Sequence, residues 1–273
     1  MNKKTKSLIE NSGLMSHLKA IDCLKNNGWS VIVSPYYYDG VSESVREIDI
    51  VAEKQFNSFH WAGSSSAQVN VQLFVECKYI NQEIVLWFDK TDKDKAVEAL
   101  GKATGLQIAV RRSGDISPDS FRYYKAENVA KLFSTTSGRE DLIYRALSQC
   151  LRALVYYTQW APGPIRNDFN RHPEAISHIV RYPIVVCGNF SNLKKLEFES
   201  PQNFSAKDLI SPFLLETNYV YFNKAKTSAI DDYFWIDFVD LDKLEEFLKN
   251  LESEAKAILE AKSLIQNIQR TRN

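Results

Sequence analysis

Two short segments of this chain place charged residues among apolar ones. The first (REIDIVAE) carries Glu47 and Asp49, and the second (VQLFVECKY) carries Glu76 and Lys78. Both segments are rich in β-branched residues, so we expect two neighbouring strands. Side chains alternate between the faces of a strand, which puts Glu47 beside Asp49 and Glu76 beside Lys78. An acid and a lysine in so apolar a strand are costly to desolvate unless they are paired or bound to a metal ion.

Phosphodiester hydrolysis is the chemistry that such a set suits. Two carboxylates bind a hard divalent cation such as Mg²⁺ through oxygen. The cation polarises a phosphoryl oxygen, lowers the pKa of a bound water and stabilises the leaving oxygen. A neighbouring lysine can orient the water and stabilise developing charge. The alternative is an ordinary ion-pair ladder across two antiparallel strands, with no catalytic role.

The order of these residues resembles that of a known superfamily. Asp49, followed by Glu76-Cys77-Lys78 on the next strand, lies behind a helix that ends in Asn27-Gly28-Trp29, as in the PD-(D/E)XK nucleases. The strings REIDIVA and ECKY resemble the Mrr-like restriction endonuclease and archaeal Holliday-junction resolvase branch. The resemblance covers residues 7–105, and the strings YPIVVC and YFWIDFVDLDKLEEFL resemble the later strands and closing helix of the same core.

The resemblance implies a role for each matching residue. Asp49 and Glu76 would bind Mg²⁺ or Mn²⁺ together with the backbone carbonyl of Cys77, and Lys78 would be the catalytic lysine. The implied activity is that of a divalent-metal-dependent nuclease acting on DNA in restriction, phage defence or repair. The alternative is a catalytically inactive relative that binds nucleic acid or a protein partner.

Four further residues are candidate accessory groups. Family members often carry another acid on the first helix, where this chain offers Glu10 and, at about the expected place, His17. His17 is either a metal ligand, a residue that positions a water, or a structural residue. Gln149 resembles a glutamine that some members place near the site. Glu47 is either an accessory acid or the partner of a neighbouring basic side chain.

The overall charge excludes a general polycation, because 34 Lys and Arg balance 34 Asp and Glu. A local basic face remains compatible with this balance. The stretch from residue 139 to 181 carries arginines interleaved with tyrosines, which suits phosphate contact and base stacking. Candidate DNA contacts are Arg139, Arg145 and Arg152, with Lys93 and Lys95 after the second strand; the alternative for each is a solvated helix face.

The elements that must position these residues follow from periodicity and turn signals. We expect helices over residues 7–27, 92–105, 140–160 and 241–270, and strands over 29–33, 46–53, 71–79, 182–187, 218–222 and 233–239. The predicted fold is α/β, with a restriction-endonuclease-like mixed central sheet flanked by helices. A single domain (1–273) would comprise a core (7–105 and 182–250), a helical insert (106–181) and a long C-terminal helix.

Other properties bear on partners and location. The last helix has apolar positions near a 3.5-residue repeat, which predicts packing on the sheet in its first half and a homodimer or protein contact beyond residue 255. The four cysteines are widely spaced, so we expect free thiols. The chain has no apolar run long enough for a membrane span and no signal peptide, and we expect a cytoplasmic protein.

Overall fold

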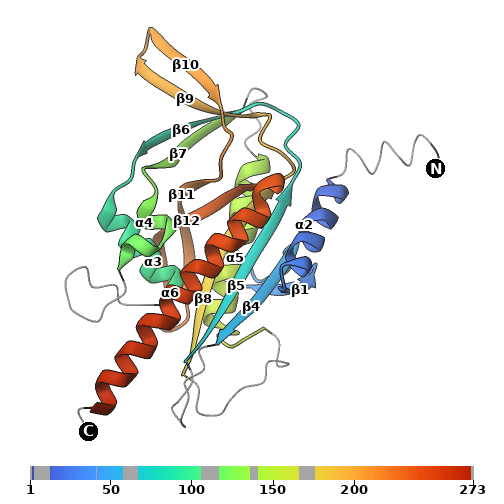
Figure 1. Cartoon of the computed structure of the whole chain (residues 1–273). Coiled ribbons are helices and arrows are strands. Elements are labelled where there is room, and N and C mark those ends of the chain that lie inside the picture. Colours follow the sequence, from blue (N-terminus) through green and yellow to red (C-terminus); the bar gives the residue numbers. More distant parts are fainter. Residues whose placement is uncertain are drawn as a thin grey trace.

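A computed structural model describes residues 2, 13–40, 42–57, 67–105, 117–135, 141–165 and 176–271, with the backbone alone at 141, 176–177 and 262–271. These residues form a large mixed sheet with helices on its faces and a long C-terminal helix (Figure 1). The predicted α/β class and its flanked mixed sheet are therefore confirmed. No helix in the described ranges combines the length and hydropathy that a membrane span requires.

The elements follow one another along the chain without internal repetition. The helices are α2 (Leu14–Asn26), α3 (Lys93–Thr104), α4 (Arg122–Lys125), α5 (Asp141–Gln159) and α6 (Leu244–Thr271), with short 3₁₀ turns η1 (Pro118–Ser120) and η2 (Leu241–Lys243). The strands are β1 (Ser30–Val33), β2 (Tyr36–Asp39), β3 (Ser44–Glu47), β4 (Ile50–Asn57), β5 (Ala67–Lys78), β6 (Ile84–Lys90), β7 (Asn128–Thr135), β8 (Ile176–Cys187), β9 (Leu193–Ser200), β10 (Asn203–Asp208), β11 (Phe213–Asn223) and β12 (Ser228–Asp240).

The strand that carries Glu76 and Lys78 lies inside the sheet. The strand order is β1-β4-β5-β8-β12-β11-β7-β6-β9-β10, and β2 with β3 forms a separate hairpin. β5 pairs antiparallel with β4 and parallel with β8, which in turn pairs parallel with β12. β5 is buried from Ala67 to Glu76, although it carries several polar side chains. Buried polar groups need hydrogen-bond partners, so those on β5 call for an account of their contacts.

Helices cover both faces of this sheet. α2, α3 and α6 pack on one face, in a core that includes Val75 and Ile184. α5 packs on the other face, in a core that includes Phe74 and Val185. Because side chains alternate along a strand, Phe74 shares its face of β5 with Glu76. The apolar stripe of α6 is buried against the sheet as far as Leu259. We predicted packing on the sheet only for the first half of this helix, so the buried part is longer than expected.

Two sequence-based predictions need correction. The segment 46–53 is not one strand, because the chain bends between β3 and β4. Ile48 and Ile50 consequently belong to cores on opposite faces of the sheet, although a continuous strand would put them on the same face. The segment 106–181 is not a purely helical insert either. It contributes β7 and the first part of β8 to the sheet, and α5 covers the sheet directly.

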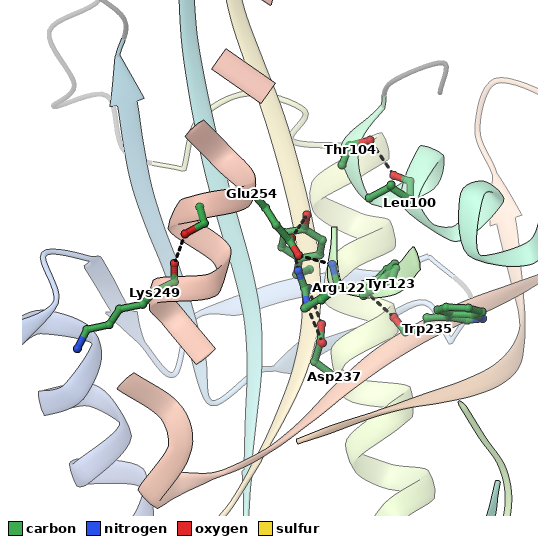
Figure 2. A network of polar contacts seen from close by, with 10 residues as sticks. Leu100, Thr104, Arg122, Tyr123, Trp235, Asp237, Lys249 and Glu254 are labelled. Carbon is green, nitrogen blue, oxygen red and sulfur yellow. Dashed lines mark hydrogen bonds and ion pairs between the residues drawn. The ribbon is translucent and has the colours of Figure 1, made fainter. Parts of the chain in front are cut away.

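An ionic network attaches α4 and α6 to the sheet (Figure 2). The Arg122 guanidinium donates to both oxygens of Asp237 on β12, at 2.8 and 2.6 Å. It also pairs with Glu254 on α6, whose carboxylate accepts from the Tyr182 hydroxyl at 3.1 Å. Tyr123, the next residue of α4, donates to the Trp235 carbonyl at 3.1 Å. These contacts join four elements, α4, β8, β12 and α6.

Candidate active site

Asp49 lies at the bend between β3 and β4, where the chain leaves the main sheet. The last registered pair between β4 and β5 is Ile50 with Val75, so Asp49 is not engaged in the strand ladder. Its side chain instead reaches β5, where Oδ2 accepts from the Cys77 N–H at 2.8 Å. Its own N–H donates to Glu76 Oε1 at 3.3 Å. The bend that sequence reasoning missed is thus what allows Asp49 to face the end of β5.

Glu76 and Lys78 share one face of β5, as their spacing predicts. Lys78 Nζ donates to Glu76 Oε2 at 2.6 Å. The same ammonium lies 3.5 Å from Gln149 Oε1, contributed by α5. The Tyr37 hydroxyl donates to the main-chain oxygen of Gln149 at 3.4 Å and so links the β2–β3 hairpin to this helix. Asp49, Glu76, Lys78 and Gln149 therefore meet at one place.

Burial dominates the electrostatics of this cluster. The Glu76 side chain is fully buried, and burial raises its pKa to about 7, although the Lys78 charge acts in the opposite direction. The nearby Asp49 charge adds to the increase. Burial lowers the pKa of Lys78, but the Glu76 charge and hydrogen bond outweigh it and hold that pKa above its ordinary value. The lysine is therefore an ammonium, while Glu76 titrates near neutrality.

His17 on α2 also reaches the cluster, through the backbone. Its Nε2 lies 3.2 Å from the Asp49 carbonyl oxygen, which also accepts from the Ser34 N–H at 2.8 Å. Of the roles considered for His17, this contact fits that of a residue that holds the Asp49 segment in place.

Sequence reasoning missed Tyr37 and Gly188. The Gly188 N–H donates to the Lys78 carbonyl at 2.9 Å. A Cβ atom at Gly188 would lie 2.6 Å from Ser16 Oγ on α2, which is closer than real Cβ atoms come. The glycine therefore lets the chain after β8 pass between α2 and the end of β5. A single glycine directly after the apolar string YPIVVC is the signal that indicates this close approach.

The carboxylate oxygens around Asp49 are ligands of the type that a hard cation prefers. Asp49 and Glu76 offer carboxylate oxygens, and Mg²⁺ commonly uses one or two carboxylates and completes its shell with water and phosphate. The N–H and C=O of one residue in an extended strand point to the same side, so the Cys77 carbonyl lies on the Asp49 side of β5. Within the described ranges, however, no group of three or more His, Cys, Asp or Glu side chains could hold a metal by itself.

Of the two remaining accessory acids, the structure describes Glu47, and this residue does not join the cluster. Glu47 ends β3 opposite Tyr36 and takes no part in the contacts that connect Asp49, Glu76 and Lys78. Glu10 lies outside the described residues. All four cysteines are free, as predicted, and burial raises the pKa of the Cys77 thiol, so this residue offers its backbone rather than a thiolate.

The arginines predicted to contact DNA belong to α5 and the residues before it. Arg145 is exposed on α5. Arg152 lies further along the same helix, where its Nε is 3.4 Å from a carboxylate oxygen of the buried Asp39. Its charge is therefore offset within the protein. Arg139 lies outside the described residues.

The two lysines predicted to contact DNA lie on α3, on the face of the sheet opposite to α5. Lys93 Nζ donates to the carbonyl oxygens of Tyr124 and Ala126. Lys95 lies 3.6 Å from a carboxylate oxygen of Glu216. The structure does not bring either lysine to the Asp49 cluster.

Neither the protein-family models, nor the curated proteins, nor the solved structures contain a match to this chain. The assignment of a function therefore depends on the geometry of the site and on the sequence motifs.

Proposed function

We propose that this chain is a divalent-metal-dependent nuclease of the restriction-endonuclease-like fold that hydrolyses phosphodiester bonds in DNA. The observation that carries the proposal is the convergence of Asp49, Glu76 and Lys78. Asp49 precedes Glu76 by 27 residues along the chain, and consecutive hydrogen bonds connect the three residues. A chance match of the motif in sequence would not require this arrangement.

The proposed roles follow from charge and burial. Asp49, Glu76 and the Cys77 carbonyl would hold Mg²⁺ or Mn²⁺, which supplies Lewis-acid activation of the phosphate and of a water. A cation next to Glu76 would also favour its charged form and so oppose the effect of burial. Lys78, kept charged by Glu76, would donate to a non-bridging phosphate oxygen or orient the attacking water.

Gln149 and His17 would act through other groups. Gln149 supplies a side-chain oxygen near the ammonium of Lys78 and so limits the positions that the lysine can take. His17 and the Ser34 N–H hold the Asp49 carbonyl from two sides. Both are positioning residues in this proposal, since neither needs to contact the substrate.

Cleavage assays with the full chain test the proposal. Single- and double-stranded DNA and RNA are incubated with Mg²⁺, with Mn²⁺ or with EDTA, for the wild type and for Asp49→Asn, Glu76→Gln and Lys78→Met. We expect metal-dependent cleavage of DNA that each substitution reduces by about 10²–10³-fold, the usual cost of removing one electrostatic catalytic group.

Two control variants separate the site from general surface effects. Asp89→Asn removes an exposed acid on β6, and Lys207→Met removes an exposed lysine on β10; both should cleave like the wild type. Cleavage that is unchanged in the three site variants would refute the site. Binding of DNA with no cleavage under any metal would support the inactive nucleic-acid-binding relative instead.

A further inference from the structure

The sheet opens between β8 and β12, at a distance along the strands from the Asp49 cluster. β8 pairs with β5 over its whole length, but with β12 only from Ile184 to Cys187. β12 meanwhile stays paired with β11 as far as Ser228. The two strands therefore diverge before Ile184, and a cavity of about 190 Å³ lies where they separate. Neither Asp49 nor Lys78 lines it.

The walls of this cavity suit a flat apolar ring. α3 and α5 contribute small and aliphatic side chains, and the β-strands contribute aromatic rings; those that matter here are Ala103, Leu154, Pro183, Tyr221, Phe234 and Trp235. The volume is below the ~300–1,000 Å³ typical of pockets for drug-sized ligands, so the cavity fits a single ring system. Aromatic walls bind nucleobases by stacking without regard to sequence.

Arg181 is the polar group that this cavity leaves incompletely satisfied. Its Nη2 donates to the Pro162 carbonyl at 3.0 Å. Its Nε is buried and, within the part of the chain that the structure describes, has no hydrogen-bond partner. Burial lowers the pKa of Arg181 to about 10, against the effect of the Glu53 charge. Buried donors of a charged group are costly when unpaired, so an acceptor in the cavity would be bound favourably.

The other cation in the cavity wall is already engaged. Lys102 pairs with Asp232 and with Glu98, and it donates to the Tyr233 carbonyl at 3.0 Å. The donor left for a ligand is therefore the Arg181 Nε–H, which can donate to a carbonyl oxygen on a base edge, such as that of guanine.

We propose that this cavity binds one nucleobase that carries a carbonyl oxygen, of the guanine type, with its ring against the aromatic wall and its carbonyl accepting from Arg181. The base could belong to a free mononucleotide or to a nucleic-acid strand that presents it unstacked. The proposal does not rest on the nuclease activity, because none of the catalytic residues takes part.

Binding of the full chain in EDTA, which excludes metal-dependent cleavage, tests this proposal. GMP and AMP are titrated calorimetrically, and an oligo(dA) strand with one central dG is compared with plain oligo(dA) by fluorescence anisotropy. We expect the guanine ligand to bind about tenfold or more tightly than its adenine counterpart in one of these two pairs, as one charge-assisted hydrogen bond allows. A preference for GMP identifies a free nucleotide, and a preference confined to the oligonucleotides identifies a base of a strand.

Three variants decide whether the cavity is responsible. Arg181→Met should abolish the preference for guanine, and Ala103→Trp should weaken binding by filling the cavity while Arg181 is retained. Lys207→Met, which changes an exposed lysine on β10 outside the cavity, should leave binding unchanged. Equal binding of guanine and adenine ligands in both pairs would overturn the proposal. So would a folded Ala103→Trp protein that binds like the wild type, even if Arg181→Met does not fold.

Discussion

Two clusters in this molecule combine one basic side chain with two acids, but they differ in how completely the acids are engaged. Arg122 donates to both acids: it binds Asp237 through two guanidinium nitrogens and Glu254 through a third, while its backbone N–H reaches Glu254 at 2.6 Å (Figure 2). Lys78 donates to one acid, Glu76. A guanidinium fork can saturate two carboxylates, whereas an ammonium is a single point of charge.

The surroundings extend this contrast. The Arg122 guanidinium lies 4.0 Å from the Tyr182 ring centroid and 4.8 Å from that of Tyr123. Burial raises the pKa of Glu254 just as it raises that of Glu76, so burial alone does not separate the clusters. What separates the two clusters is the number of hydrogen-bond donors that the basic residue supplies to the acids. Both acids of the Arg122 cluster are saturated by its guanidinium and its backbone, whereas Lys78 donates to one acid alone, and the proposed cation would use the carboxylate oxygens that remain.

Removing the arginine should have the largest effect on stability. Arg122→Met leaves Asp237 and Glu254 buried without their cation, which we expect to cost about 3–5 kcal/mol in the free energy of unfolding. Lys78→Met should cost much less, because Glu76 already has a pKa of about 7 and can take up a proton. Urea denaturation of both variants at pH 7 measures the difference.

Arg122→Lys is the matched control, because it keeps the positive charge and removes the guanidinium group. It should recover only part of the lost stability, since an ammonium cannot bind both acids in the same way. Equal losses for Arg122→Met and Lys78→Met would mean that the two clusters are alike and that the contrast between them is wrong.

The next largest effect is a dependence of stability on pH in the metal-free protein. The pKa of Glu76 is about 7 in the folded state against an ordinary 4.5, so the folded chain retains a proton that the unfolded chain has lost. Stability from this group is thus present below pH 4.5 and is lost as pH rises towards 7, by up to about 3 kcal/mol. Urea denaturation from pH 4.5 to 8 in EDTA should show this loss.

Glu76→Gln isolates that contribution, because the amide keeps the shape and carries no proton to lose. The variant should show a smaller decrease in stability over this pH window and should equal or exceed the wild type at pH 8. Parallel curves for the two proteins would show that Glu76 does not titrate near neutrality.

The pairing of Glu76 with Lys78 was accessible from sequence because it depends on local rules. The i, i+2 spacing places Glu76 and Lys78 on one face, and the apolar strings around them indicate interior strands. The bend at Asp49 was not accessible, since EIDIV has the composition of an uninterrupted strand. The Arg122 network could not be predicted either, because Asp237 and Glu254 lie 115 and 132 residues from Arg122 and no sequence pattern indicates the pairing.

The strands that sequence patterns missed lack the apolar alternation that marks a strand, for two different reasons. β6 (IVLWFDK) is a short apolar run, and such runs fit a strand or a buried helix equally well. β9 and β10 form a hairpin whose second strand is exposed along its whole length, so no apolar alternation marks it. The predicted helices α3 and α5, with a side-chain cap at Asp92 and a clear apolar face respectively, were found within one residue of the expected bounds.

A moderate effect is expected from the cation itself. At pH 8, Mg²⁺ at tenfold above its dissociation constant should stabilise the wild type by about 1.4 kcal/mol, because it binds the folded state only. Asp49→Asn and Glu76→Gln should lose this gain, and Asp237→Asn, which changes an acid of the Arg122 cluster, should keep it. Thermal denaturation with Mg²⁺ and with EDTA gives the values. Stabilisation that depends on Asp237 and not on Asp49 would reverse the roles of the two clusters.

The smallest effect should come from His17. If His17 positions Asp49 through its backbone, His17→Ala removes one of two hydrogen bonds to the Asp49 carbonyl and costs about 0.5–1.5 kcal/mol, seen as a several-fold lower cleavage rate at saturating metal. His17→Gln, which can still donate, should restore part of that rate. If His17 were instead a metal ligand, the alanine variant would need at least about tenfold more Mg²⁺ for half-maximal cleavage, and the rate at saturation would recover. Measuring the cleavage rate as a function of Mg²⁺ concentration for the three proteins therefore separates the two roles. It also shows whether the cluster of Asp49, Glu76 and Lys78 depends on a hydrogen bond to its backbone, whereas the Arg122 cluster depends on contacts between side chains.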